Sequence, residues 1–303
     1  MKQTFYSNGK LLITGEYVVL DGAKAFALPT KFGQNLIIEN AEGKQITWKS
    51  YDSDGSIWFQ DTIAFSDIIN KTTFENHAVK NTLITILHEA YQLNPDYLQK
   101  SNGYSATTKL TFPKNWGLGT SSTLINNISS WLKIDAFELL QKSFGGSGYD
   151  IACAQNDTPI LYQLLNKKPN VEKVAFEPNF KENIYFVYLN KKQNSRNAIE
   201  SYNKKKNNLE AIIPQINDIT DQILNSNDLE NFEIQLEKHE YLMSQVLETA
   251  TIKQTSFTDF DGTIKSLGAW GGDFVMVISI QKPHEYFRQK GYSVVLSYAE
   301  MIL

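Results

Sequence analysis

The chain has 303 residues, 42% of them hydrophobic and 20% charged, which is enough apolar material for a buried core. Its formal net charge of -4 argues against general binding to nucleic acid or to an anionic membrane, since both require a basic face. One cysteine, Cys153, excludes an intramolecular disulfide and a cysteine-based zinc cluster. Lys10 and Glu16 interrupt the stretch where a signal peptide is apolar, and no apolar run could span a bilayer, so we expect a cytoplasmic protein.

The first half of the chain alternates between strand and helix patterns. Strands are expected at 9–20, 35–40, 44–50 and 56–60, with turn residues between them. A helix is expected over 77–93, because one helical face carries Val79, Leu83, Leu87 and Ala90. A strand at 104–112 and a second helix follow, and the apolar face of that helix consists of Leu124, Ile125, Ile128, Trp131 and Leu132.

The second half begins after a polar stretch at 166–173, and we expect two domains, 1–167 and 168–303. A strand at 184–190 precedes helical stretches at about 197–224 and 228–250, and Pro214 is expected to bend or divide the first of them. Strands within 266–280 enclose a glycine loop, and a last strand is expected at 292–298. This segregation of strands and helices predicts an α+β fold in both halves.

Glycines and hydroxyl residues stand directly before the helix that begins near residue 120. The segment GLGTSS (117–122) therefore lies at a helix N-terminus, where unpaired N–H groups and the positive end of the dipole point outward. Glycines allow a ligand to approach the backbone closely, and a hydroxyl can be a metal ligand. The segment is suited to an anion, although Ser and Thr also cap helices that bind nothing.

Three further features accompany this segment. Lys10 begins a strand, Asp150 follows a second glycine loop (FGGSGYD), and a third loop (LGAWGGDFV) lies near the C-terminus. A solvated lysine, a helix-cap carboxylate and a tight turn would each explain one of them. Phosphoryl transfer, however, needs backbone N–H groups and a cation around a triphosphate, Mg2+, and a group that orients the attacking oxygen. Their order along the chain favours a phosphotransferase, although neither a P-loop nor a dinucleotide fingerprint is present.

Three segments resemble the motifs of the GHMP kinase superfamily, which includes galactokinase, homoserine kinase, mevalonate kinase and phosphomevalonate kinase. GKLLITGEYVVLDGA resembles the first motif, PKNWGLGTSST the second (Pro-x-x-x-Gly-Leu-Gly-Ser-Ser-Ala) and LGAWGGDFV the third (Gly-Ala-Gly-Gly-Gly). The resemblance spans nearly the whole chain. It implies a two-domain α+β fold, with a ribosomal-S5-domain-2-like N-terminal domain, a ferredoxin-like C-terminal domain and ATP between them.

The resemblance also implies roles for individual residues. The ATP phosphates would be bound by Gly117, Leu118, Gly119, Thr120, Ser121 and Ser122. Ser121 would provide the hydroxyl on Mg2+, and Lys10 and Asp150 would flank the attacking oxygen. The acceptor would be bound by Glu16, Tyr17, Ser147, Gly148, Gly268, Gly271, Gly272 and Asp273. ATP and Mg2+ are therefore the expected cofactors.

The chain departs from the family pattern at two positions that matter for the site. Thr120 replaces the first serine of the second motif and keeps its hydroxyl. Trp270 stands where the third motif has glycine, and its indole could narrow the pocket or change access to the phosphates. The segment GEY and the aspartate of GGD, Asp273, look like phosphomevalonate kinase, whereas mevalonate kinase typically has GEH, a GGGG loop and a Mg2+-binding glutamate where this chain has Leu139.

Two features outside the motifs bear on the acceptor. Lys192, Ser195 and Arg196 immediately follow a strand, where a loop facing a pocket is expected, and arginine is suited to bidentate phosphate binding. Most lysines of this basic run are also explained by a solvated helix face. His239 lies on an apolar helix stripe, which favours a hydrogen-bonded core histidine over a substrate contact.

The sequence therefore predicts an ATP- and Mg2+-dependent small-molecule kinase of the GHMP type. The expected acceptor is a small phosphorylated or hydroxy-acid molecule, first phosphomevalonate and next mevalonate, in isoprenoid precursor synthesis. Mevalonate diphosphate decarboxylase shares the fold and is a more distant alternative. A non-catalytic binding protein with this fold is another, favoured by Trp270 and opposed by the presence of Lys10, Ser121 and Asp150. We expect no nucleic-acid or membrane partner and a monomer or homodimer.

Overall fold

The computed structural model describes residues 2–193, 195–205 and 208–303, without the side chains of Ser195 and Arg196. The chain forms two compact units that interleave in sequence. The first unit contains the residues up to Gly9 together with 32–114 and 118–155, and the second contains 10–31, 115–117 and 156–303. The division into two domains that the sequence suggests, 1–167 and 168–303, remains a prediction.

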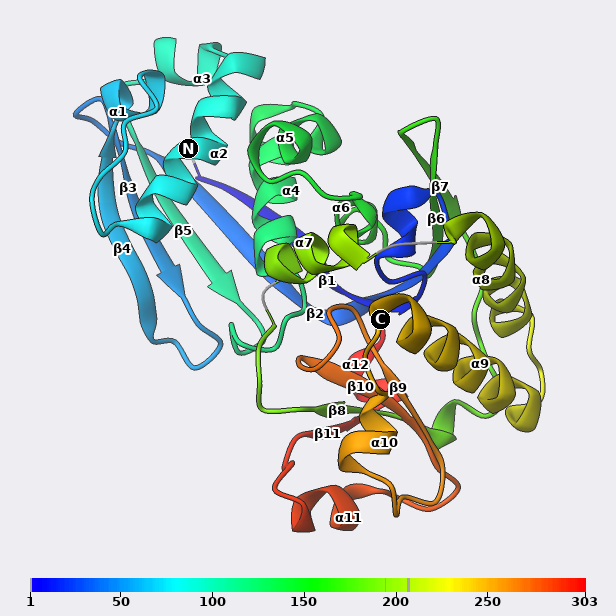
Figure 1. The fold of residues 1–303 in the computed structure, drawn as a ribbon. Helices are drawn as coiled ribbons and strands as arrows, with labels where there is room; N and C mark the ends of the chain where they lie inside the picture. Colours follow the sequence, from blue (N-terminus) through cyan, green and yellow to red (C-terminus); the bar gives the residue numbers. More distant parts are fainter. Residues whose placement is uncertain (1, 194, 206–207) are drawn as a thin grey trace. The chain divides into compact units, whose positions relative to one another are not determined.

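Two long strands, β1 (Lys2–Thr14) and β2 (Ala25–Asn40), contribute residues to both units. In the first unit the strand order is β4 (Ile57–Ala64), β3 (Gln45–Tyr51), β5 (Tyr104–Leu110) and β2 (Figure 1). β3 runs parallel to β5, while β4 pairs with β3 and β2 with β5 in antiparallel register. Alternate residues of β3 are buried, which is typical of a sheet that packs on one face.

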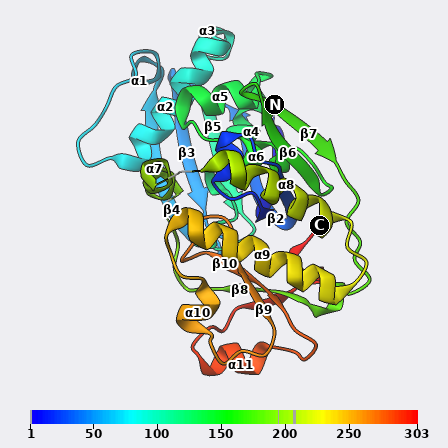
Figure 2. The same cartoon turned by 45° about the vertical axis from the view of Figure 1, so that its right-hand side comes forward.

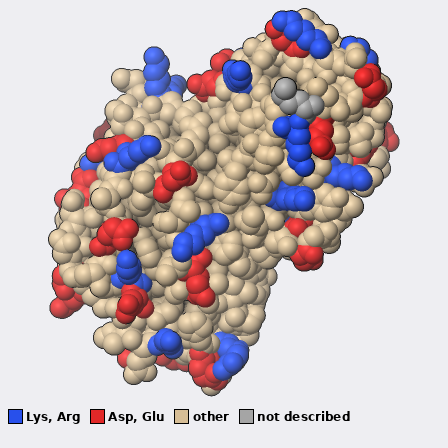
Figure 3. Space-filling model, turned by 180° about the vertical axis from the view of Figure 1, so that it is seen from behind, with Lys and Arg blue, Asp and Glu red and all other residues tan. Residues whose placement is uncertain are grey.

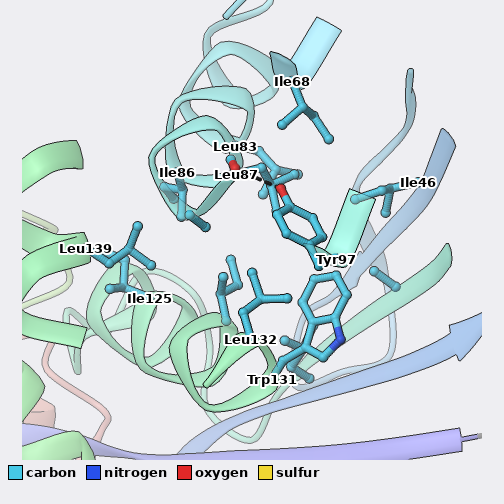
Figure 4. Close-up of a cluster of buried hydrophobic side chains, with 14 of the residues drawn as sticks. Ile46, Ile68, Leu83, Ile86, Leu87, Tyr97, Ile125, Trp131, Leu132 and Leu139 are labelled. Carbon is cyan, nitrogen blue, oxygen red and sulfur yellow. Dashed lines mark hydrogen bonds between the residues drawn. The ribbon is translucent and has the colours of Figure 1, made fainter. Parts of the chain in front are cut away.

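The helices of the first unit share one core with its sheet. They are α1 (Phe65–Ile69), α2 (Ala78–Leu93), α3 (Asp96–Gln99), α4 (Thr120–Leu132), α5 (Ala136–Ser143) and α6 (Tyr149–Ala154). In Figure 4 the Trp131 indole of α4 lies beside Tyr97 of α3, with ring centroids 5.6 Å apart. The Tyr97 hydroxyl donates to the Leu87 carbonyl oxygen of α2 at 2.8 Å, and Ile125 and Leu132 belong to the same core. The helix expected over 77–93 is confirmed as α2, but Val79 is exposed and lies outside its buried face. The apolar face expected for α4 packs in this core, with Leu124 half-buried at its edge.

The second unit has two groups of paired strands. β6 (Ile160–Leu165) pairs with β7 (Lys168–Lys173) and with residues 25–27 of β2. A separate antiparallel sheet has the order β11 (Val295–Ser297), β8 (Ile184–Tyr188), β10 (Phe274–Ile278) and β9 (Thr263–Ser266). β8 and β10 are buried along their whole length, as their continuous apolar sequences indicate. The third glycine loop connects β9 to β10.

The remaining elements belong to the second unit. They are the 3-10 turns η1 (Val18–Asp21) and η2 (Lys181–Asn183), and the helices α7 (Ser195–Lys205), α8 (Leu209–Leu224), α9 (Leu229–Leu247), α10 (Ile252–Ser256), α11 (His284–Gln289) and α12 (Tyr298–Met301). α8 and α9 lie side by side, and α9 also contacts β9 (Figure 2). Pro214 lies inside α8 and so does not divide the first helical stretch, while the other expected effect, a bend, stays a prediction. α7 ends at Lys205 and α8 begins at Leu209, with Asn208 at the N-cap position in a left-handed conformation (φ of 51°).

The surface carries charges of both signs. On the face shown in Figure 3, acidic and basic side chains are interspersed and separated by uncharged areas. Among the residues described, no helix combines the length and the apolar character that a membrane crossing requires.

Candidate active site

Lys10 contacts the GLGTSS segment (117–122) at Gly117, and both residues belong to the second unit. It lies on β1, is half-buried, and its Nζ donates a hydrogen bond to the carbonyl oxygen of Gly117 at 3.1 Å. Gly117 has a φ of 69°, a conformation that glycine adopts without the steric cost of a Cβ. A lysine near the start of the chain and a glycine more than a hundred positions later are thus brought into direct contact.

Asp273, from the third glycine loop, lies against the same glycine. A Cβ added at Gly117 would overlap the Asp273 carboxylate, so the two loops are in close contact. The Asp273 N–H donates to the Lys191 carbonyl at 2.6 Å, and its Oδ1 accepts from the Gln193 N–H at 3.2 Å. Burial raises the pKa of Asp273, and the positive charges of Lys10 and Lys192 oppose this effect. Asp273 also has a φ of 53°, a strained value for a residue with a side chain, of the kind that clusters at functional sites.

The third loop is closely packed against residues 191–193. A Cβ at Gly272 would come within 2.6 Å of Gln193 Cγ and of the Lys191 carbonyl oxygen. Gln193 also donates from Nε2 to the Trp270 carbonyl at 3.0 Å. Gly268 and Gly271 have φ values of 60° and 87°. Gln193 therefore holds the second half of the loop, from Trp270 to Asp273, a role that sequence reasoning missed because glutamine in a basic run gives no signal.

Trp270 is held by the first motif rather than projecting freely. Its backbone N–H donates to the Tyr17 hydroxyl at 3.2 Å. Its indole packs at the edge of a buried cluster drawn from η1, α7, α8 and α9, which includes Val18, Tyr202 and Met243. The indole Nε1 is buried without a hydrogen-bond partner among the residues that the structure describes. Tyr17 has a φ of 61°, and its ring centroid lies 5.5 Å from that of Tyr202, so this aromatic group joins two glycine-containing turns.

The N-terminus of α4 lies in the first unit. Gly119 precedes the helix with a φ of 101°, and no side chain in the described part of the chain caps it by a hydrogen bond. The Thr120 hydroxyl oxygen is buried and has no partner among the described residues, and Ser121 is exposed. Ser122, by contrast, donates to the Gly119 carbonyl at 2.9 Å. An uncapped helix start with an unpaired hydroxyl is suited to an anionic ligand.

Buried polar side chains fix α4 to the strands beneath it. Asn127 donates to the Gln34 carbonyl at 2.9 Å and accepts from the Ser7 hydroxyl at 2.9 Å. Thr123 donates to the Gln34 side chain at 2.9 Å. Because buried polar groups are costly unless paired, this network allows few alternative positions for the helix. The N-terminus of α4 is therefore held by β1 and β2.

Asp150 lies near the start of α6 in the first unit, and α6 contacts α4. Its Oδ1 accepts from the Ile151 N–H at 3.1 Å. Gly148 precedes α6 with a φ of 90°, and Ser147 is buried. Asp150 and α4 thus belong to one packed group, whereas Lys10, Gly117 and Asp273 belong to the other unit.

Glu16, expected at the acceptor, is a buried carboxylate. Lys265 Nζ donates to its Oε1 at 2.5 Å, and His239 Nε2 lies 3.4 Å from its Oε2. Burial raises the pKa of Glu16 to about 7, even though the Lys265 charge lowers it and the Glu240 charge adds to the rise. A contact of Glu16 with the acceptor stays a prediction.

The Glu16 pKa predicts a pH dependence of stability. A carboxyl group whose pKa rises from 4.5 to about 7 on folding binds its proton more tightly in the folded state. The stabilisation of the fold by this group is therefore fully present below pH 4.5 and is lost as the pH rises toward 7. Comparing wild type with Glu16→Gln isolates this term from Glu240, whose pKa burial also raises, and from His239, whose pKa burial lowers. Between pH 4.5 and 7, we expect the free energy of unfolding of Glu16→Gln, measured in urea, to rise by roughly 3 kcal/mol relative to that of wild type. The same pH dependence of the free energy of unfolding in both proteins would contradict this.

The basic segment after β8 is only partly described. Lys192 is exposed in the loop that precedes α7. The side chains of Ser195 and Arg196 lie outside the described residues, so their assignment to the acceptor stays a prediction. His239 is wholly buried and accepts from the Gly15 N–H at 3.0 Å, which confirms the expected core histidine.

No family model and no curated protein matches the sequence. Solved structures do match the fold. The mevalonate kinase of Methanococcus jannaschii aligns with a TM-score of 0.69 at 17% identity, covering 98% of this chain and 97% of that chain. The phosphomevalonate kinase of Streptococcus pneumoniae, solved with phosphomevalonate and AMPPNP, gives 0.67 at 16% identity, covering 99% and 98%.

A third similar structure is that of a kinase named for a sugar phosphate substrate. It is a D-glycero-D-manno-heptose 1-phosphate kinase from Bacteroides thetaiotaomicron, with a TM-score of 0.68, 16% identity and coverage of 100% and 96%. The structural neighbours are thus kinases of the GHMP type that act on different small molecules. At these identities the likeness establishes architecture and not the acceptor. The chain therefore has the two-domain α+β fold of the GHMP kinases.

Proposed function

We propose that the protein is an ATP-dependent small-molecule kinase of the GHMP type. The observation that carries this proposal is the contact of Lys10 Nζ with Gly117, the first residue of the glycine loop that leads into α4. A cation fixed at a glycine-rich turn that precedes a helix is suited to binding the phosphates in phosphoryl transfer. The kinases of similar fold support the same reaction class.

The residues around the α4 N-terminus fit the phosphates of a nucleotide. The helix has no side-chain cap in the described chain, and the buried Thr120 hydroxyl has no partner there. We assign Gly117, Leu118, Gly119, Thr120 and Ser122 to the phosphates and the exposed Ser121 hydroxyl to Mg2+. The described residues include no cluster of three His, Cys, Asp or Glu side chains that could hold a metal, so Ser121 would share the ion with phosphate oxygens and water. When bound, ATP and Mg2+ supply the phosphoryl group and neutralise part of its charge.

The side chains of this protein would then perform two tasks. We assign the Lys10 ammonium to the negative charge on the transferred group, because a fixed donor stabilises charge that develops in the transition state. We assign Asp150 to the attacking oxygen. An acceptor hydroxyl would give its proton to the Asp150 carboxylate, whereas an acceptor phosphate is already ionised and needs cations more than a base.

For the acceptor we propose phosphomevalonate first and mevalonate second. Asp273 in the third loop and GEY in the first motif favour phosphomevalonate, and Lys192, whose charge acts on Asp273, provides a cation for its phosphate. Glu16, Tyr17, Ser147, Gly148, Gly268, Gly271, Gly272, Ser195 and Arg196 remain proposed acceptor contacts. The similar structures include both kinases, which is why mevalonate stays the alternative.

One assay tests this assignment. Purified protein with ATP and Mg2+ is supplied separately with mevalonate, phosphomevalonate, diphosphomevalonate, galactose and homoserine, and ADP is measured. Release only with phosphomevalonate supports the first choice, and release with mevalonate alone supports the second. Release of CO2 with diphosphomevalonate would identify the decarboxylase. ADP release with galactose or homoserine alone would reject the assignment to isoprenoid precursor synthesis. No ADP with any acceptor would favour a non-catalytic protein.

Replacing Ser121 with alanine should raise the Mg2+ requirement. Loss of one oxygen ligand is expected to increase the Mg2+ concentration for half-maximal rate about tenfold at saturating ATP. Ser130→Ala is the matched control, because Ser130 is also an exposed serine on α4. Initial rates across a Mg2+ series give the result, and an unchanged midpoint in Ser121→Ala would remove Ser121 from the metal site.

A further inference from the structure

A buried cluster of charged side chains lies beneath the first motif in the second unit. Lys265, on β9, is wholly buried, and its Nζ donates to Glu16 Oε1 at 2.5 Å and to the Ser266 carbonyl at 2.8 Å. Glu240, on α9, is 4% exposed and places Oε2 at 3.8 Å from the same ammonium. One cation and two carboxylates are thus enclosed together.

Two residues of α9 complete the cluster. The Glu240 carboxylate accepts from the Ser266 N–H at 3.1 Å and from the Ser266 hydroxyl at 2.8 Å. His239, the preceding residue, accepts the Gly15 N–H at its Nε2. That bond requires a neutral ring, and burial together with the Lys265 charge lowers the pKa of His239 well below its ordinary value. Consecutive residues of one helix therefore hold both β9 and the turn that contains Glu16.

The cluster is connected to the candidate site at two points. Gly15 and Glu16 directly precede Tyr17, whose hydroxyl accepts the Trp270 N–H of the third loop. Ser266 is the last residue of β9, and the third loop, which ends at Asp273, starts next to it. A shift of Lys265 or Glu240 would thus displace the first turn and the start of the third loop together.

Burial makes the geometry of these groups restrictive. A charged side chain removed from water is tolerated only when its partners are well placed, and removing one partner leaves the others uncompensated. Such a cluster has few alternative arrangements of similar energy. None of the roles assigned above to the phosphates or the acceptor uses Lys265, Glu240 or His239.

We propose that Lys265, supported by Glu240 and His239, is a positioning residue that fixes the Gly15–Tyr17 turn relative to the third glycine loop. Its significance for catalysis rests on the proposed kinase function, but its effect on the two loops does not. Lys265 acts through Glu16 and Ser266 and does not itself reach a ligand.

Hydrogen exchange followed by mass spectrometry tests the proposal on the full chain without ligand. In Lys265→Met, peptides covering 15–21 and 267–273 are expected to exchange about tenfold faster, while peptides from β5 stay unchanged. Lys24→Met is the control, since Lys24 is paired with Asp221 at 2.6 Å in the same unit but is partly exposed. Equal protection of both peptides in Lys265→Met and wild type would overturn the proposal, as would the same loss in Lys24→Met.

A milder variant keeps the test decisive if Lys265→Met does not fold. Glu240→Gln retains an oxygen that can accept from Ser266 and removes the charge beside Lys265, so the same two peptides should lose protection to a smaller extent. Uniform loss across both units, or none, would overturn the proposal. In the phosphotransfer assay, a positioning role predicts a lower kcat with KM for ATP within about twofold of wild type. A wild type inactive toward every acceptor would reject the kinase function and leave the exchange result standing.

Discussion

We expect Lys10→Met to lower kcat on the order of a thousandfold, because a fixed cation that stabilises developing charge contributes this much in comparable sites. Lys10 Nζ is held at 3.1 Å from the Gly117 carbonyl, and its charge acts on Asp273. Methionine keeps most of the side-chain length and volume, so the strand should retain its packing. ADP formation under saturating ATP and acceptor measures the change, and urea unfolding reports whether the fold is preserved.

Lys31→Met is the matched control for this prediction. Lys31, on β2, also donates from Nζ to a backbone carbonyl, that of Ala299, but it is exposed. It therefore loses the same kind of hydrogen bond without touching the glycine loops. Comparable rates in the two variants would mean that Lys10 is a structural lysine and that the phosphate site lies elsewhere.

The sequence is a good guide to elements with a strong apolar period. The spacing of residues such as Leu83 and Ile125 predicts α2 and α4, because a helix that packs on a sheet must bury one stripe. Unbroken apolar runs predict β8 and β10. In these segments the local pattern and the tertiary packing favour the same structure.

Elements that depend on backbone pairing are less predictable. β7 is exposed along its whole length and is polar in sequence, yet it pairs with β6 through main-chain hydrogen bonds that no side-chain pattern reveals. The apolar run of Val18, Val19 and Leu20 misleads in the opposite direction, because the strand expected over 9–20 ends at Thr14 and this run forms the 3-10 turn η1. The chain turns at Gly15, which has a φ of 83°, and the strand therefore ends at Thr14.

The candidate site shows the same division. The glycine loops and Lys10 are recognisable from sequence, since glycine, lysine and hydroxyl residues at a helix start indicate anion chemistry. Gln193 and Lys265 are not, because a polar residue gives no local sign of the buried partner it meets. Glu16, Glu240 and Lys265 come together from three distant segments, and only the fold makes them neighbours.

Replacing Gly117 with alanine should reduce both stability and activity. The residue has a φ of 69°, where a Cβ costs about 1–2 kcal/mol. The new methyl group would also overlap the Asp273 carboxylate, so the two loops must separate. Because Lys10 binds the Gly117 carbonyl, we expect kcat to fall on the order of a hundredfold, as for loss of an oriented donor.

Two variants separate strain from collision in this prediction. Gly55→Ala has a similar φ of 82° but open space around the new methyl group, so it should lose only the strain term in urea unfolding and keep full activity. Gly117→Ala combined with Asp273→Gly removes the collision and leaves the strain, and it should regain part of the stability lost by Gly117→Ala alone. If the double variant were no more stable than the single one, the contact between Gly117 and the third glycine loop would not constrain the site.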